Sequence, residues 1–520
     1  MAITVEETPK SYNPIYNDNV VLLSSNLTSN DKFKFVIDVD LEAPGLGYFL
    51  LGRFKCPNIS DLATGTFRGY FNLKELLSTS QYFASNDLMV FDKKSWRIRV
   101  TPGEEYAASP TAAPVYYPAS GQIFTYVGFN GSLRLKEYID FVPSDLVDPT
   151  VIAASSGIAQ YPLTTYRLPK KVLKSTISEL TFLTNGGTNT RAVASYYINN
   201  ALITTQTIAL TTANNTDVTI DASYSTLNVP TTANKIGIRL ERISNGEWLS
   251  NQYEYDIVDA CSKFDKVNVY FQNKWGGMDA FVFNMRETVT DQIDRKNYQK
   301  MDRYIQTYNA YNQASQTYAS TIKTTHVLNT DWVTEAEMNW LSELAESNNV
   351  LISYNSEYIE GSRAQFTLRI TKSQNDLWEI LNSQTLAATK SGPVSLTLTL
   401  NPDTVIYDTA LDLYVAYESV IASSNWATYF DIDSSGVDLD NIVLVFTAKA
   451  KGTSYNLTSI TDGDQMTVSD YTDGSNETLP TLIPVTVDNN SFEWKKSTVD
   501  KLFQLELRAT ETSLYNRQTQ

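Results

Sequence analysis

The stretch KVNVYFQNKWGGMDAFVFNMR, residues Lys266–Arg286, places a pair of glycines between two apolar runs. A phosphate-binding loop would use its glycines to open a helix, with a Gly-Lys-Ser/Thr sequence or a third glycine at fixed spacing. None of these is found here, and the residues after Gly277 continue as an apolar strand. We therefore predict two strands joined by a tight turn in which the glycines supply positive φ angles, with Asp279 supporting the turn and binding no ligand.

The same alternation of extended runs and turns covers most of the chain. In KFKFVIDVD, Lys32–Asp40, apolar side chains occupy alternate positions, as in a strand with one buried face. Asn199 with Asn200, Asn245 with Gly246, and the FNGS of 129–132 each predict a hairpin turn. Periodicity does not separate a sandwich from a barrel. The predicted fold class is mainly β: a multi-domain β-sandwich or barrel protein with a short helix packed on the third domain and a small α/β insertion.

Breaks in composition divide the chain into four predicted domains. An N-terminal β domain covers 1–145, and a β-sandwich-like domain covers 146–285. A C-terminal β domain is formed by 286–391 together with 477–520. The segment 392–476, richer in small polar and acidic residues, is predicted to be an inserted small α/β domain.

The clearest predicted helix covers about 333–347. Thr334 is the expected N-cap, and Glu337 three residues later completes a capping box. Val333 and Met338 are spaced to form a hydrophobic staple around the cap. A second helix is predicted within the insertion, over TALDLYVAYESVIASS.

Composition restricts the class of protein. The formal net charge of −17, from 41 basic and 58 acidic residues, disfavours binding to nucleic acid. The two cysteines, Cys56 and Cys261, form no disulfide framework, and whether they pair is left open. We expect neither a secretion signal nor a membrane span. A Thr-, Asn- and Tyr-rich β composition without a route for export is typical of virion proteins, which fold and assemble in the host cytoplasm.

Few residues suggest chemistry. His326 is the one histidine of the sequence, and with no recognisable nucleophile motif elsewhere we interpret it as a structural residue at a strand end. Paired carboxylates could still hydrolyse glycosides, but 58 acidic residues give that pattern no specificity. We predict no catalytic residue, no cofactor and no enzymatic activity.

Calcium is the one metal that the sequence suggests. DIDSSGVDLDN, residues Asp431–Asn441, resembles the first half of an oxygen-ligand loop, with Asp431, Asp433 and Asp438 as weak candidate ligands. Ile442 occupies the twelfth position, where an EF-hand requires a bidentate glutamate. A solvated acidic loop is the alternative interpretation.

Several segments resemble virion proteins of tailed bacteriophages, especially those that infect Bacteroidota. The similar segments are YNPIYNDNVVLLSSNLTSNDKFKFVIDVDL near the N-terminus, YEYDIVDACSKFDKVNVYFQNKWGGMDAFVFNMRETVTDQIDRKNY, HVLNTDWVTEAEMNWLSELAESNNVLI, and the closing PVTVDNNSFEWKKSTVDKLFQLELRATETSLYNRQTQ. Met278 departs from the family pattern, which has an aromatic residue there. Within the insertion, IVLVFTAKAKGTSYNLTSI is similar to a small unit repeated in phage tail proteins that decorates virion surfaces or mediates subunit contacts.

The resemblance implies an architectural role in the virion tail, or in a tail-proximal ring, hub or baseplate, and transfers no catalytic residues. The expected partners are further copies of the chain and other tail or neck proteins, with extended arms around Lys300 to Lys323 available for contacts. The alternative is a receptor-binding or carbohydrate-binding tail adhesin that contacts a host surface glycan. A polysaccharide depolymerase is the third hypothesis.

Overall fold

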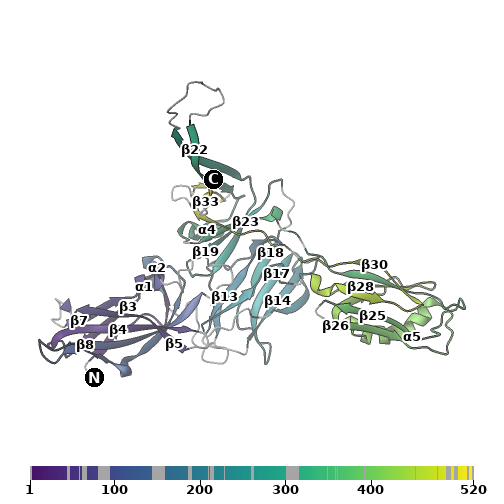
Figure 1. The fold of residues 1–520 in the computed structure, drawn as a ribbon, viewed down its shortest axis with the longest axis horizontal. Coiled ribbons are helices and arrows are strands. Elements are labelled where there is room, and N and C mark those ends of the chain that lie inside the picture. The colour runs from purple at the N-terminus through teal and green to yellow at the C-terminus, as the bar shows by residue number, and fades with distance from the viewer. Residues whose placement is uncertain are drawn as a thin grey trace, which may run out of the picture. The chain divides into compact units, whose positions relative to one another are not determined.

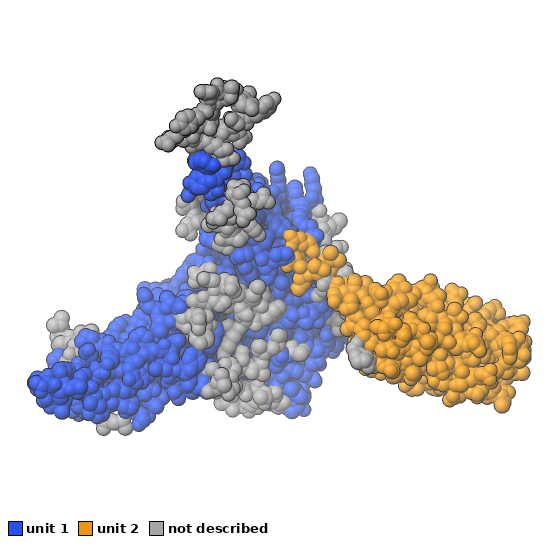
Figure 2. All heavy atoms as spheres, in the orientation of Figure 1, with its two compact units in different colours: residues 1–356, 481–520 blue, residues 357–480 orange. Residues whose placement is uncertain are grey.

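The computed structural model of the chain defines two compact units, Met1–Ser356 with Thr481–Gln520, and Glu357–Pro480 (Figure 2). The residues that the structure describes are 3–43, 47–57, 59–60, 67–79, 94–142, 158–184, 190–208, 210, 216–227, 229–258, 263–299, 315–347, 349–357, 359, 361–391, 394–450, 452–476, 478–487, 493–496, 502–511 and 515–517. Strands dominate both units, and the prediction of a mainly β, multi-domain protein is confirmed (Figure 1). The four predicted domain boundaries stay predictions; the segment 392–476 lies entirely within the second unit.

The N-terminal part of the first unit contains two sheets. One has the strand order β1-β3-β7-β6, and the other β2-β10-β8-β4-β5 with β9 paired to β8. The strand and helix bounds are β1 (Ile3–Glu7), β2 (Tyr12–Pro14), β3 (Val20–Ser25), β4 (Asp31–Ala43), β5 (Gly47–Pro57), β6 (Ile59–Ser60), β7 (Phe67–Asn72), α1 (Lys74–Thr79), β8 (Ser95–Ala107), β9 (Val115–Pro118), η1 (Ser120–Gln122), β10 (Phe124–Phe129) and α2 (Leu135–Asp140). Phe33, Phe35, Ile37 and Val39 are all buried, as predicted for one face of this strand, but Val36 and Asp40 on the other face are buried as well, so the strand is covered on both sides there.

One local prediction in this part is wrong. Phe129–Ser132 does not connect two strands of a hairpin, because β10 ends at Phe129 and the chain then enters α2. Leu135 and Ile139 of α2 are 72% and 68% exposed, so no buried apolar face marks this helix in the sequence. Glu137 caps its first turn by accepting from the backbone N–H of Arg134, at 3.2 Å.

The central part of the first unit forms a second pair of sheets, ordered β11-β13-β16 and β12-β18-β17-β14-β15. Their strands are β11 (Ile158–Pro162), β12 (Lys170–Val172), β13 (Glu179–Thr184), β14 (Thr190–Ile198), β15 (Ala201–Ile208), β16 (Asp217–Asp221), β17 (Lys235–Arg242) and β18 (Tyr253–Ile257). Asn199 and Asn200 both have positive φ angles and join β14 to β15, as predicted. Gly246, with φ +69°, turns the chain after β17, also as predicted.

The fifth sheet of the first unit has the order β20-β19-β23-β31-β33-β22-β21, with β32 paired to β33 and β34 to β22. The elements are β19 (Val267–Gln272), β20 (Met278–Phe283), β21 (Thr288–Gln299), β22 (Ser315–Asn329), α4 (Glu335–Glu346), β23 (Val350–Tyr354), η3 (Asn355–Glu357), β31 (Ile483–Val487), β32 (Glu493–Lys496), β33 (Phe503–Glu511) and β34 (Tyr515–Arg517). Thr334 caps α4 and forms the predicted capping box with Glu337. Trp340, Leu341 and Leu344 of α4 pack into the core of this sheet.

The second unit, Glu357–Pro480, contains sheets ordered β27-β28-β24-β30 and β26-β25-β29. Its elements are β24 (Gln365–Ile370), β25 (Gln384–Lys390), β26 (Val394–Leu400), α5 (Ala410–Ser423), α6 (Trp426–Tyr429), β27 (Phe430–Asp433), β28 (Ile442–Ala448), η4 (Thr453–Tyr455), β29 (Leu457–Thr461) and β30 (Met466–Thr472). Trp426 is fully buried among aromatic rings that include Phe366 and Phe446. This unit has a hydrophobic core of its own.

Candidate functional site

The glycine pair forms the predicted hairpin connection between β19 and β20, which pair antiparallel up to Gln272 and Met278. Of the two glycines only Gly276 has a positive φ, at +84°. Gly277 is required for a different reason, because a Cβ there would lie 2.2 Å from the carbonyl oxygen of Leu163. The turn therefore supports close packing of the chain, and both glycines serve backbone geometry.

Asp279 follows this turn and is 3% exposed. Its carboxylate forms an ion pair with the Lys170 ammonium and accepts hydrogen bonds from Thr164 Oγ1, at 3.0 Å, Asn273 Nδ2, at 2.9 Å, and Trp340 Nε1, at 3.0 Å. The bond from Asn273 supports the turn, as predicted. The other partners join the hairpin to the strand β12 region and to α4, so Asp279 ties three segments of the first unit together.

Glu343 of α4 lies beside this cluster. It accepts from Thr165 Oγ1 at 2.7 Å and from the backbone N–H of Lys274 at 3.2 Å. Burial raises the pKa of the Glu343 carboxyl to about 7, although these hydrogen bonds and the charge of Lys274 oppose the shift. The adjoining cavity, lined by Lys274, Glu343 and Asn273 among others, has a volume of about 40 Å³. It has room for one to a few water molecules and lies far below the roughly 300 Å³ of a small-molecule site, so we interpret the cluster as a structural junction.

His326 lies on β22 and is 3% exposed, between two carboxylates. Its Nδ1 is 2.9 Å from Glu287 Oε1, its Nε2 is 3.1 Å from Glu511 Oε1, and the Tyr354 hydroxyl donates to Glu287 at 2.7 Å. Burial alone would lower the histidine pKa, but the hydrogen bonds and charges of the two glutamates raise it above the ordinary value. Both ring nitrogens are occupied by carboxylates. The geometry fits a structural imidazolium that links β22 to its neighbours in the sheet.

The candidate calcium ligands lie on β27 and in the turns that follow it. Asp433 accepts from the backbone N–H of Ser435, and Asp438 from that of Asp440, both at 2.8 Å. These hydrogen bonds lower the pKa of both carboxyls. Among the described residues no group of three or more His, Cys, Asp or Glu could hold a metal ion. Calcium binding by Asp431, Asp433 and Asp438 stays a prediction.

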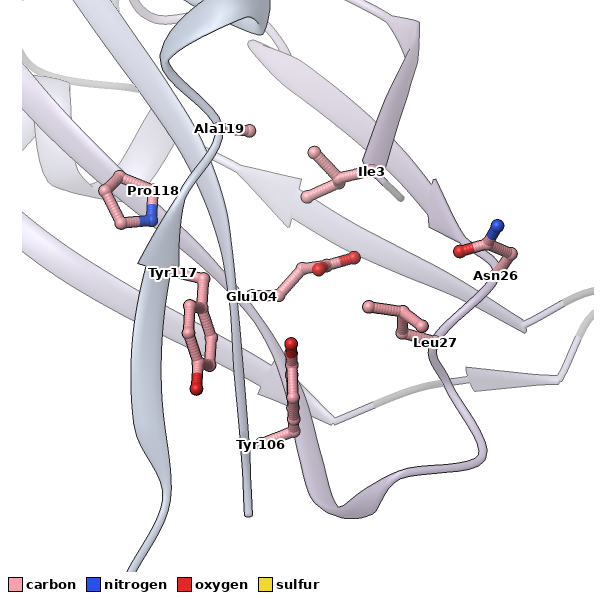
Figure 3. Close-up of a pocket in the computed structure, with 8 residues that line it drawn as sticks. All are labelled: Ile3, Asn26, Leu27, Glu104, Tyr106, Tyr117, Pro118 and Ala119. Carbon is pink, nitrogen blue, oxygen red and sulfur yellow. The ribbon is translucent and has the colours of Figure 1, made fainter. Parts of the chain in front are cut away.

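A pocket that the sequence did not indicate opens at one end of the N-terminal sheets (Figure 3). Its volume is about 360 Å³, and both sheets contribute to its lining: Ile3, Asn26, Leu27, Glu104, Tyr106, Tyr117, Pro118 and Ala119. The Tyr106 and Tyr117 rings stack with centroids 4.7 Å apart. The run EEYAASPTAAPVYYP contains four of these residues, but only the pairing of β8 with β9 brings them together.

The hairpin of β21 and β22 forms an arm, defined here as Thr288–Gln299 with Ser315–Ile322. β22 pairs with β33 over Thr325–Asn329 and with β34 over Ser320–Ile322, and the arm continues beyond both pairings, as Figure 1 shows. Every side chain of Thr288–Tyr298 is exposed, on both faces of the strand. The predicted contact region around Lys300 to Lys323 falls partly on this arm; 300–314 lie outside the described residues.

Comparison with known proteins adds no family: the chain matches no protein-family model, and no curated protein matches it. Within the part of the chain that the structure describes, no helix has the length and apolar character needed to cross a membrane. Cys56 is a free thiol, and Cys261 lies outside the described residues. What the fold defines is a multi-domain β-sandwich protein.

Proposed function

We propose that the protein is a structural component of a bacteriophage virion, in the tail or a tail-proximal ring, hub or baseplate, and that it acts by assembling with further copies of itself. The sequence segments that resemble virion proteins support the class. The arm of β21 and β22 is the observation that supports assembly. On this proposal the protein is not an enzyme and resides in the particle.

Beyond Ser320, where the pairing with β34 ends, the arm is a two-stranded ribbon, which is marginally stable in water, and its strand β21 has side chains exposed on both faces. Val289, Ile293, Tyr298 and Tyr318 are each about half exposed. Burying such side chains stabilises by roughly 1.5 to 3 kcal/mol each for full burial. A neighbouring subunit that covers one face of the arm would therefore stabilise both the arm and the assembly.

The backbone of the arm supports the same proposal. β21 is the last strand in the order of its sheet, so its outer N–H and C=O groups have no strand partner among the described residues. A long exposed edge is a template for pairing with another chain unless charges or bulges block it. The register shift within the arm leaves Tyr318 of β22 as the extra residue, so the bulge lies on β22 and not on the edge strand β21. Head-to-tail contacts of this kind, repeated with the same operator, form a ring when the rotation between neighbours closes, and a ring is the arrangement that we propose.

The clusters that could suggest catalysis support an architectural role instead. The carboxylate of Asp279 is occupied by an ammonium and three neutral donors, and His326 has a carboxylate on each ring nitrogen. Groups held in this way rigidify a frame. They leave neither side chain available to a substrate in this conformation.

Mass spectrometry of purified phage particles tests the proposal. The chain should be recovered from intact particles in a fixed ratio to the other tail proteins. Absence from particles, with abundance in the infected-cell lysate, would refute the structural role.

The contribution of the arm is tested with the double variant Ile293→Asp, Tyr298→Asp. Both side chains are exposed, so the fold of the subunit should be kept while the oligomer dissociates, as measured by light scattering. Leu50→Asp, at an equally exposed leucine of β5, is the matched control. An arm variant that assembles like the wild type would show that other surfaces make the contacts.

A further inference from the structure

We propose that the pocket at the end of the N-terminal sheets binds a primary alkylammonium group, with Glu104 as its counter-charge and Tyr106 as its aromatic wall. This inference does not rest on the proposed function. It concerns a ligand chemistry that both a lysine side chain of another protein and a free aliphatic amine would supply.

The buried carboxylate of Glu104 is the main observation. Glu104 is 6% exposed, and among the described residues its one hydrogen-bond partner is the hydroxyl of Ser25. The adjacent Glu105 is also buried, at 8% exposed, but forms an ion pair with Lys55. Burying a charge costs free energy unless the charge is paired, so a cation bound beside Glu104 would offset the cost of burying its carboxylate.

The direction of the side chain places this charge inside the cavity. Figure 3 shows the carboxylate of Glu104 with Ile3 on one side and Leu27 and Tyr106 on the other. An ammonium has three N–H donors, and one carboxylate oxygen of Glu104 already accepts from Ser25, which leaves the other to face the ligand.

The aromatic wall fits the same ligand. Tyr106 stands edge-on between Tyr117 and Leu27, so one ring face rests on Tyr117 while the other turns toward the pocket (Figure 3). A cation over a tyrosine face is attracted by the ring quadrupole, and more strongly when it is desolvated. Ile3 and Ala119, both 3% exposed, add apolar surface against which an aliphatic stem can pack.

A neutral sugar is the competing ligand, because tyrosine rings and a carboxylate also bind hydroxyl groups. The missing counter-charge favours the cation. A sugar would satisfy hydrogen bonds at Glu104 but would leave its charge buried and unpaired. The volume of about 360 Å³ accommodates a four-carbon amine without requiring the walls to move.

Calorimetric titration of the full-length protein tests the proposal with n-butylammonium chloride, 1,4-diaminobutane, a lysine tripeptide with blocked ends, and glucose. The ammonium probes should bind saturably, and glucose should not. Tighter binding of the tripeptide than of the diamine would identify a protein side chain as the ligand, and the reverse order a free amine.

Glu104→Gln keeps the shape of the side chain and removes its charge, and it should weaken the ammonium probes by at least about tenfold. Tyr106→Leu should weaken them by about threefold or more. Glu105→Gln, which removes the neighbouring buried charge outside the pocket, should bind like the wild type. A melting curve for each variant verifies that it is folded.

The proposal is overturned if the wild type binds neither ammonium probe nor the tripeptide, or if Glu104→Gln binds them as tightly as the wild type. Binding of glucose that survives Glu104→Gln would show instead that the pocket takes a neutral sugar.

Discussion

Asp279→Asn should destabilise the first unit strongly. The substitution keeps the size of the side chain but leaves the ammonium of Lys170 without its counter-charge, and the Lys170 side chain is only 9% exposed. Breaking a buried ion pair by removing one partner costs about 3 to 5 kcal/mol. The entropy of unfolding is about 2.1 cal/mol/K per residue, so a unit of about 400 residues changes its melting temperature by about 1.2 °C per kcal/mol, and the first unit should melt about 4 to 6 °C lower.

Differential scanning calorimetry of the full-length protein measures this change. The second unit has its own core around Trp426, so its transition should stay in place and serve as an internal control. In the double variant Lys170→Met, Asp279→Asn no unpaired charge remains. It should be at least about 2 kcal/mol more stable than the sum of the single effects predicts.

A first-unit transition within about 1 °C of the wild type in Asp279→Asn would refute this reasoning, because a buried carboxylate with a cation and three other donors cannot be neutralised at so small a cost. Additive effects of the two single substitutions would show that Lys170 and Asp279 do not act as a pair.

Three further changes have defined outcomes. Because the pKa of His326 is raised in the folded state, its contribution to stability is fully present below the unfolded pKa of about 6.5 and is lost as the pH rises through the folded pKa. The stability of His326→Gln, measured by urea unfolding, should therefore approach that of the wild type as the pH increases. A constant difference between the two proteins from pH 5 to 9 would contradict this. The pKa of Glu343 is raised from 4.5 to about 7, so the wild type loses stability as the pH rises between these values. The free energy of unfolding of Glu343→Gln should therefore rise by about 3 kcal/mol relative to that of the wild type between pH 4 and pH 8. No such rise would show that the carboxyl is well solvated. Trp426→Ala should cost about 3 to 5 kcal/mol and lower only the second-unit transition in calorimetry; a shift of both transitions would show that the two units unfold together.

The elements predicted correctly from the sequence are those with a local cause. Thr334 and Glu337 lie three residues apart and form the cap of α4 without help from the rest of the chain. Asn199 and Asn200 adopt positive φ angles that few other residues tolerate. The helix α2 was missed although its cap is also local, because Leu135 and Ile139 face solvent and the helix therefore shows no buried apolar face in the sequence.

The polar clusters could be predicted only in part, because they join residues that lie far apart in the sequence. The role of Asp279 in the turn was predictable because Asn273 is six residues away, but its pairing with Lys170 joins positions 109 residues apart. His326 was predicted to lie at a strand end, and it is found on β22, but no pattern in the sequence indicates its contact with Glu511, which is 185 residues away. The pocket around Glu104 could not be predicted because both N-terminal sheets line it. That Glu104 has no basic partner there among the described residues is likewise seen only in the folded chain.

Electron microscopy of the purified full-length chain tests the central claim, assembly through the arm of β21 and β22, most directly. We predict closed rings of one size for the wild type, and single subunits for the variant Ile293→Asp, Tyr298→Asp. Wild-type particles that remain single subunits at every concentration, or rings that persist in the arm variant, would contradict it.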